Sequence, residues 1–252
     1  LECRTCIRNV WDEPLGQMSS APFARIVEGL KTFSPVPTAF FGGFGEPLAH
    51  PDIVDMVAHA KAAGAPVELI TNGTLLTQDM SRSLIEAGLD MLWVSLDGAT
   101  PESYTDVRLG AALPEVLANL RGFRDARRAS HPPRPQMGIV FVAMRRNIAD
   151  LPEVIRLGDQ SGAKRFLVTN VLPYSAEMLN EVLYSRALTD IVYIPSMFRL
   201  ELPKIDVNET TRQALYYIMR GGYSVSFAGG NLGEIHDRCL FIESGVTTIS
   251  WE

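Results

Sequence analysis

The chain has 252 residues, of which 46% are hydrophobic and 21% are charged, and its net charge at pH 7 is −6. This length predicts one or two globular domains, and no apolar run approaches the roughly 18 residues of a membrane span. The acidic balance argues against a nucleic-acid-binding protein, and the odd count of three cysteines argues against a disulfide framework and favours a reducing, cytoplasmic setting.

Two of the cysteines lie at the start of the chain, where Cys3 and Cys6 are separated by two residues. Zinc sites, redox disulfides and iron–sulfur clusters all use this spacing, so the pair alone does not identify the site. The first residue is Leu1 rather than Met, and only two residues precede Cys3. We therefore expect a fragment of a longer protein.

From residue 38 to residue 170, short apolar runs alternate with segments of helical periodicity. This pattern predicts an α/β fold built from βα units around a parallel sheet. Strands are expected at residues 38–41, 67–70, 91–94, 138–142 and 165–168. Helices are expected at about residues 20–32, 53–60, 113–123 and 151–162. Periodicity leaves an open, doubly wound sheet as an alternative to a barrel.

The pattern loosens after residue 173. Residues 176–186 and 208–220 are expected to be helical, and residues 241–251 to form two short strands. We therefore divide the chain into a first domain over residues 1–172 and a C-terminal extension over residues 173–252.

Polar and glycine-rich motifs follow three of the predicted strands. They are Gly42-Gly43-Phe44-Gly45-Glu46-Pro47, then Thr71-Asn72-Gly73, then Ser95-Leu96-Asp97-Gly98. Carboxyl ends of parallel strands meet at one end of the sheet, where ligand sites form. Glycines let the backbone pass close to a ligand, and Glu46 supplies an acceptor for an ammonium group. Taken singly, each motif is equally well explained as a turn.

The order and spacing of these motifs after Cys3-x-x-Cys6 resemble the radical S-adenosylmethionine (SAM) enzymes. The resemblance implies a partial (β/α)6 TIM-like barrel of parallel strands, whose first strand would precede Cys3. It also implies that Cys3 and Cys6 are the second and third ligands of a [4Fe-4S] cluster, with the first ligand two positions before Leu1.

The resemblance further implies a SAM site. Gly42, Gly43, Gly45 and Glu46 would hold the amino end of SAM. Ser95 and Asp97 would contact its ribose or carboxylate, and Arg108 would pair with the carboxylate. The expected cofactor-binding set is completed by Thr71, Asn72, Asn147 and Val168, the last flanking the adenine.

The third cysteine, Cys239, resembles the first cysteine of the SPASM or twitch extension found in some radical SAM enzymes. It would begin a hairpin and ligate an auxiliary iron–sulfur cluster. A competing interpretation combines His236 and Cys239 with Cys3 and Cys6 in a zinc site, which would stabilise an ordinary α/β protein.

The function implied by the resemblance is reductive cleavage of SAM to a 5′-deoxyadenosyl radical, which abstracts hydrogen from a substrate. Reduced ferredoxin or flavodoxin would donate the electron. The segment 6–16 resembles maturases of tungsten-containing oxidoreductases, so a peptide or a tungsten enzyme is the expected substrate. A catalytically inactive SAM-binding relative is the remaining alternative, and the sequence assigns no catalytic residue.

Overall fold

The computed structural model of the chain describes residues 1–10, 14, 16–128, 134–171, 175–182 and 224–227. The strands of this part form one sheet: β1 (Ala39–Phe41), β2 (Val67–Thr71), β3 (Met91–Ser95), β4 (Gln136–Ala143), β5 (Arg165–Asn170) and β6 (Ser224–Phe227). They lie side by side in chain order, and every neighbouring pair is parallel. A doubly wound sheet reverses its strand order partway across, so the open-sheet alternative does not fit.

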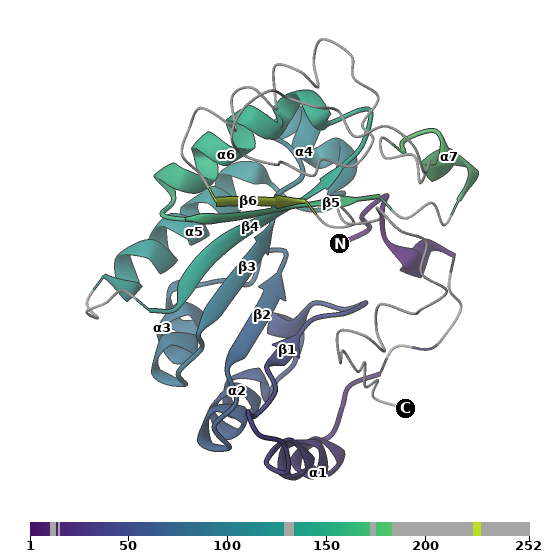
Figure 1. Ribbon diagram of the computed structural model, residues 1–252. Coiled ribbons are helices and arrows are strands. Elements are labelled where there is room, and N and C mark those ends of the chain that lie inside the picture. Colours follow the sequence, from purple (N-terminus) through teal and green to yellow (C-terminus); the bar gives the residue numbers. More distant parts are fainter. Residues whose placement is uncertain (11–13, 15, 129–133, 172–174, 183–223, 228–252) are drawn as a thin grey trace, which may run out of the picture.

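Helices precede and separate the strands along the chain. They are α1 (Ser20–Leu30), α2 (Ile53–Ala62), α3 (Gln78–Glu86), α4 (Pro101–Val107), α5 (Leu113–Arg127), α6 (Leu151–Gln160) and α7 (Ala176–Leu179). Three short 3-10 helices are η1 (Ile7–Asn9), η2 (Pro47–Ala49) and η3 (Ile148–Asp150). Figure 1 shows the sheet curving, with α2, α3, α5 and α6 along its outer side. No helix among the described residues is long and apolar enough to cross a membrane.

The main core lies between the sheet and these helices. Alternate residues of each strand point to the same face, so Leu69, Leu92 and Phe166 are buried against the helices. The helices meet them with residues at helical spacing, such as Val57 and Leu120. Full burial of each such aliphatic side chain stabilises the fold by roughly 1.5–3 kcal/mol.

A smaller cluster lies apart from the main core. It consists of Val107, Met144, Val171 and Met178, from the end of α4, the segments after β4 and β5, and α7. This cluster joins the carboxyl ends of the last predicted strands to α4 and α7.

The five strands and four helices expected from the sequence are present, with bounds that differ by a few residues. α3, α4 and β6 are additional elements. The helix expected over residues 176–186 is wrong in its extent, because α7 ends at Leu179 and residues 180–182 are not helical. The helix at 208–220, the strands at 241–251 and Cys239 lie outside the described residues.

Candidate cofactor site at the carboxyl ends of the strands

The two N-terminal cysteines lie in a compact turn. The amide of Cys6 donates a hydrogen bond to the carbonyl oxygen of Cys3 (3.0 Å), and Asn9 Nδ2 donates to the same oxygen (2.9 Å). Both thiols are free and half-buried. The turn therefore presents two unbridged thiols of the type that bind iron or zinc.

This cysteine loop, residues 2–6, docks on the end of α4. The amides of Glu2 and Arg4 donate to the carbonyl oxygens of Leu109 (3.1 Å) and Val107 (3.0 Å). Alternate residues of the loop are thus hydrogen-bonded to alternate residues of a segment more than 100 positions away. The loop is consequently held beside the residues that follow β3.

The glycine-rich segment after β1 has a backbone that larger residues could not adopt. A Cβ atom at Gly42 would lie 2.4 Å from the Phe40 ring and 2.8 Å from Ile70 Cγ2. Gly43 has a φ of +118°, in the region that favours glycine. These two positions set the path of the chain from β1 to Glu46.

Glu46 fastens this segment to the end of β2. Its Oε1 accepts hydrogen bonds from Thr71 Oγ1 (2.6 Å) and from the amide of Leu48 (3.1 Å). Its Oε2 accepts from the amide of Asn72 (2.8 Å). Asn72 in turn accepts from the amide and hydroxyl of Thr74. The structure therefore brings into contact Glu46, Thr71 and Asn72, three residues of the expected cofactor-binding set.

A buried ion pair forms at the end of β3. Asp97 Oδ2 accepts from Arg108 Nε (2.6 Å) and Nη2 (2.5 Å), and the two side chains are 0% and 11% exposed. Asp97 Oδ1 accepts from the amide of Val142 (2.7 Å), which ties β3 to β4. Burial lowers the pKa of Arg108, but the charges of Asp97 and Cys3 outweigh it, so the pKa lies above its ordinary value.

Arg108 also reaches the cysteine loop. Its Nη1 lies 3.8 Å from Cys3 Sγ, within the range of a hydrogen bond to sulfur. One guanidinium therefore links the buried carboxylate after β3 to a candidate metal ligand. The expected pairing of Arg108 with a SAM carboxylate differs from this arrangement, since two of its nitrogens are bonded to Asp97.

Two other predicted residues lie nearby. Asn147 is 1% exposed: its Nδ2 donates to the carbonyl oxygens of Asp97 and Val142 (both 3.0 Å), and its Oδ1 accepts from the amide of Met144. Asn147 thus joins the ends of β3 and β4. Ser95 is the last residue of β3 and is 9% exposed.

Val168 differs from the expectation that it flanks an adenine. It is fully buried, and it belongs to the core between sheet and helices. The neighbouring strand residue Leu167 is half-buried and points to the other face. The alternation of side chains along β5 therefore places Val168 on the helix-facing side of the sheet.

Sequence reasoning did not single out Tyr104, which lies one helical turn before Arg108 on α4. Its ring is fully buried, and its hydroxyl is the only buried side-chain polar atom of the described residues that lacks a hydrogen-bond partner. Burial raises the pKa of Tyr104 to about 12, with smaller effects from Arg108, Asp97 and Cys3. The sequence offered one signal for Tyr104, because it stands four residues before Arg108, a spacing that brings side chains together on a helix.

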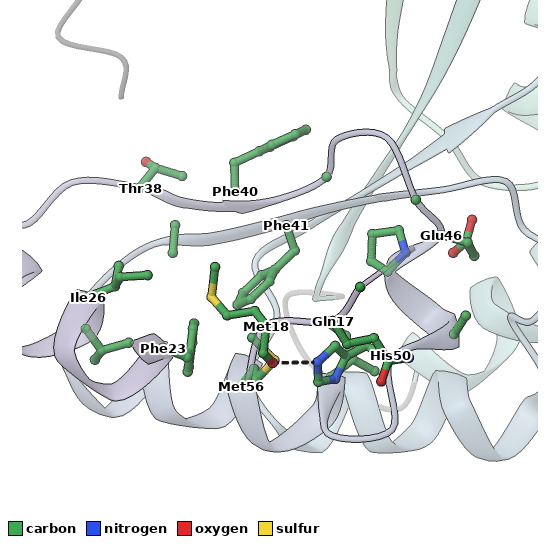
Figure 2. A pocket seen from close by; sticks show the side chains of 18 of the residues that line it. Gln17, Met18, Phe23, Ile26, Thr38, Phe40, Phe41, Glu46, His50 and Met56 are labelled. Atoms are coloured by element: carbon green, nitrogen blue, oxygen red, sulfur yellow. Dashed lines mark hydrogen bonds between the residues drawn. The ribbon is translucent and has the colours of Figure 1, made fainter. Parts of the chain in front are cut away.

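A pocket of about 860 Å³ opens beside the glycine-rich segment. Figure 2 shows Phe23 and Ile26 of α1 and Phe41 of β1 on its walls, with Glu46 at one end. His50 Nε2 is 2.9 Å from the carbonyl oxygen of Met18, which the dashed line marks. Gly42 and Gly45 line the pocket as well, whereas among the described residues Cys3, Cys6 and Asp97 do not.

Within the described part of the chain, no group of three or more His, Cys, Asp or Glu side chains is placed to hold a metal ion. Cys3 and Cys6 are thus two members of a candidate set. Both Cys239 and His236, the remaining ligands of the zinc interpretation, fall beyond the residues that the structure describes.

Similarity to known proteins was found by sequence. The chain is 30% identical over 253 residues to the tungsten-containing aldehyde ferredoxin oxidoreductase cofactor-modifying protein of Pyrococcus furiosus, covering 100% of this chain and 65% of that protein. It is 27% identical over 228 residues to the PqqA peptide cyclase of Gluconobacter oxydans, covering 90% and 57%. The chain therefore spans less than two thirds of the length of either relative.

Solved structures with a similar fold were also found. Streptococcus suis SuiB bound to its precursor peptide SuiA superposes with a TM-score of 0.65 at 15% identity, over 90% of this chain and 45% of SuiB. SuiB bound to S-adenosylmethionine gives a TM-score of 0.63. At this identity the likeness shows a shared fold. The family model described as the Radical SAM superfamily matches residues 1–157, well over half of the chain, and the chain therefore belongs to the radical SAM superfamily.

Proposed function

We propose that this chain is the SAM-binding part of a radical SAM enzyme that matures another enzyme or its cofactor. The observation that carries the proposal is the contact of Arg108 with both Asp97 and Cys3, because it joins a cysteine thiol to the strand ends where SAM is expected. Family membership and the names of the relatives support it.

The donor set suits an iron–sulfur cluster. Cys3 and Cys6 are free thiols that would supply two of its ligands, and the guanidinium of Arg108 lies beside the sulfur of Cys3. Held there and reduced, such a cluster would supply the one electron needed for cleavage of SAM into methionine and a 5′-deoxyadenosyl radical. The protein contributes binding, orientation and exclusion of competing reactions.

The chain's own residues divide into two sets. Glu46, Thr71 and Asn72 fix the backbone of the glycine-rich segment, whose peptide groups and remaining carboxylate lone pairs would bind the amino end of SAM. Ser95 would contact the ribose. Asp97 is enclosed, so we assign it the orientation of Arg108, whose remaining nitrogen Nη1 faces the thiol of Cys3.

Several parts of the proposal concern the whole protein. The substrate would be a tungsten enzyme, its cofactor or a peptide, in keeping with the names of the Pyrococcus furiosus and Gluconobacter oxydans relatives. Reduced ferredoxin or flavodoxin would donate the electron in a cytoplasmic setting. Residues 1–172 would form the radical SAM domain, and Cys239 in residues 173–252 would ligate an auxiliary cluster.

The decisive experiment is anaerobic iron–sulfur reconstitution of the full-length protein, followed by assay of 5′-deoxyadenosine formation from SAM under a strong reductant. We expect product, and we expect Cys3→Ala to abolish it. If the protein takes up iron but cleaves no SAM, with or without the candidate tungsten enzyme in the assay, the result would favour an inactive SAM-binding relative. Zinc instead of iron would favour the zinc-stabilised α/β protein.

The maturation role has a separate test. Co-expression of the full-length protein with a tungsten-containing aldehyde ferredoxin oxidoreductase should raise the specific activity of the oxidoreductase relative to co-expression with the Cys3→Ala variant. Equal activities in the two samples would refute the tungsten-enzyme assignment and leave the SAM chemistry to the first experiment.

A further inference from the structure

A network of two arginines and three carboxylates lies at the rim of the sheet. Arg4 belongs to the cysteine loop, Asp106 to α4, Arg146 to the segment after β4, Glu177 to α7, and Glu181 follows α7. Four segments that are distant in the sequence therefore meet through charged side chains.

Arg146 is the centre of this network. Its Nη1 lies 3.0 Å from Asp106 Oδ2, and its Nη2 lies 3.0 Å from Glu177 Oε1 and 2.9 Å from Glu181 Oε1. The amide of Arg146 also donates to Glu181 Oε2 (3.0 Å). The arginine side chain is only 24% exposed, so its contacts are partly shielded from solvent.

Arg4 shares two of the same carboxylates. Its Nη2 lies 3.4 Å from Asp106 Oδ1 and its Nη1 lies 3.5 Å from Glu177 Oε1, while its Nε donates to the carbonyl oxygen of Asp106 (2.6 Å). Arg4 stands between Cys3 and Cys6. Without Arg146, Asp106 and Glu177 would each lose the better placed of their two cations.

We propose that Arg146 is a positioning residue for the cysteine loop, which it holds against α4 and couples to α7 by fixing Asp106 and Glu177 for Arg4. Arginine suits this task because its planar guanidinium can bond several carboxylates at once. This inference depends on the proposed function at one point only, namely that the cysteine loop binds a cluster.

The first test needs no cluster. Hydrogen exchange, measured by mass spectrometry on the cluster-free protein, reports the amides of Glu2, Arg4 and Cys6, each of which is hydrogen-bonded in the docked loop. Arg146→Met should speed exchange in peptides covering residues 1–10 by roughly fivefold, which corresponds to the loss of about 1 kcal/mol. Unchanged exchange in a cooperatively folded variant would overturn the proposal.

A matched control and a double variant sharpen the result. Arg82→Met removes an arginine that pairs with Asp79 within α3 and does not belong to the network. It should leave exchange at residues 1–10 unchanged. Arg4→Met combined with Arg146→Met should match Arg4→Met alone. If the two arginines acted independently, two fivefold effects on the exchange rate would multiply to about 25-fold in the double variant. That result would contradict the proposal.

Salt provides a test without substitution. In the wild-type protein, 1 M NaCl should speed exchange of the loop toward the rate of the Arg146→Met variant, and the variant, which keeps only the ion pairs of Arg4, should respond less. Equal salt responses in the two proteins would overturn the proposal. If Arg146→Met fails to fold, Glu181→Gln can replace it in this comparison. That substitution weakens the contacts of Arg146 with residue 181 and removes no contact of Arg4.

The consequence for the site is measured separately. In the reconstituted full-length protein, a chelator should remove iron about fivefold faster from Arg146→Met than from Arg82→Met. Equal release rates would refute the link between the network and the cluster. A wild-type protein that takes up no iron would instead count against the proposed function, while the exchange experiments would still decide the role of Arg146.

Discussion

The buried ion pair between Asp97 and Arg108 makes a quantitative prediction. Asp97→Asn keeps the side-chain shape, so Oδ1 still accepts from the amide of Val142, but the negative charge beside Arg108 is lost. The carboxylate is 0% exposed and Arg108 is 11% exposed, so solvent can do little to compensate. Breaking a buried pair in this way costs about 3–5 kcal/mol, and the partial access of Arg108 favours the lower value, about 3 kcal/mol.

The assay is urea and thermal unfolding of the cluster-free protein, followed by circular dichroism. A loss of about 3 kcal/mol should lower the midpoint temperature by roughly 6–12 °C for a domain of this size. The double variant Asp97→Asn with Arg108→Met removes both charges and should be more stable than Asp97→Asn alone. Wild-type stability in Asp97→Asn, or simple additivity in the double variant, would refute this account of the pair.

Three further predictions follow from individual positions. Gly43→Ala, at a φ of +118°, should cost about 1–2 kcal/mol, while Gly45→Ala, with open space around it and no left-handed φ, should cost less; equal costs in urea unfolding would contradict the backbone argument. The pKa of Tyr104 is raised to about 12 in the folded protein, whereas the unfolded pKa is near 10. The free energy of unfolding therefore keeps its full value below pH 10 and falls as the pH rises toward the folded pKa. Between pH 9 and pH 11 the wild type should lose about 1.3 kcal/mol of this free energy that Tyr104→Phe does not lose. Val168→Ala should cost about 2 kcal/mol of stability yet leave SAM affinity unchanged by calorimetry in the reconstituted full-length protein, and a severalfold weaker affinity would return Val168 to the cofactor site.

The sheet was largely predictable because its strands are continuous or alternating apolar runs bounded by glycine and proline. β6 was not, since Ser224–Phe227 has only four residues and every second one is serine. α4 was also missed, because the segment is polar and short. Its N-terminus carried a readable signal: Thr100 and Ser103 form a capping box around Pro101.

The candidate site was predictable in its parts and not in its connections. The resemblance indicated that Glu46, Thr71 and Asn72 share a site, and they do contact one another. By contrast, no local pattern reveals that Arg108 bonds Asp97 and approaches Cys3, because these contacts depend on how α4 packs after β3. The burial of the Asp97 carboxylate and of most of the Arg108 side chain likewise depends on tertiary packing.

The docking of the cysteine loop also bears on the order of folding. Glu2 and Arg4 precede their backbone partners Leu109 and Val107 by more than 100 residues, and Glu177 comes later still. Contacts of such large sequence separation form only after the intervening loop closes, which is slow and entropically costly. The thiols of Cys3 and Cys6 therefore reach their native places only after these distant partners have packed, and metal capture would be favoured only once the strands through β5 have assembled.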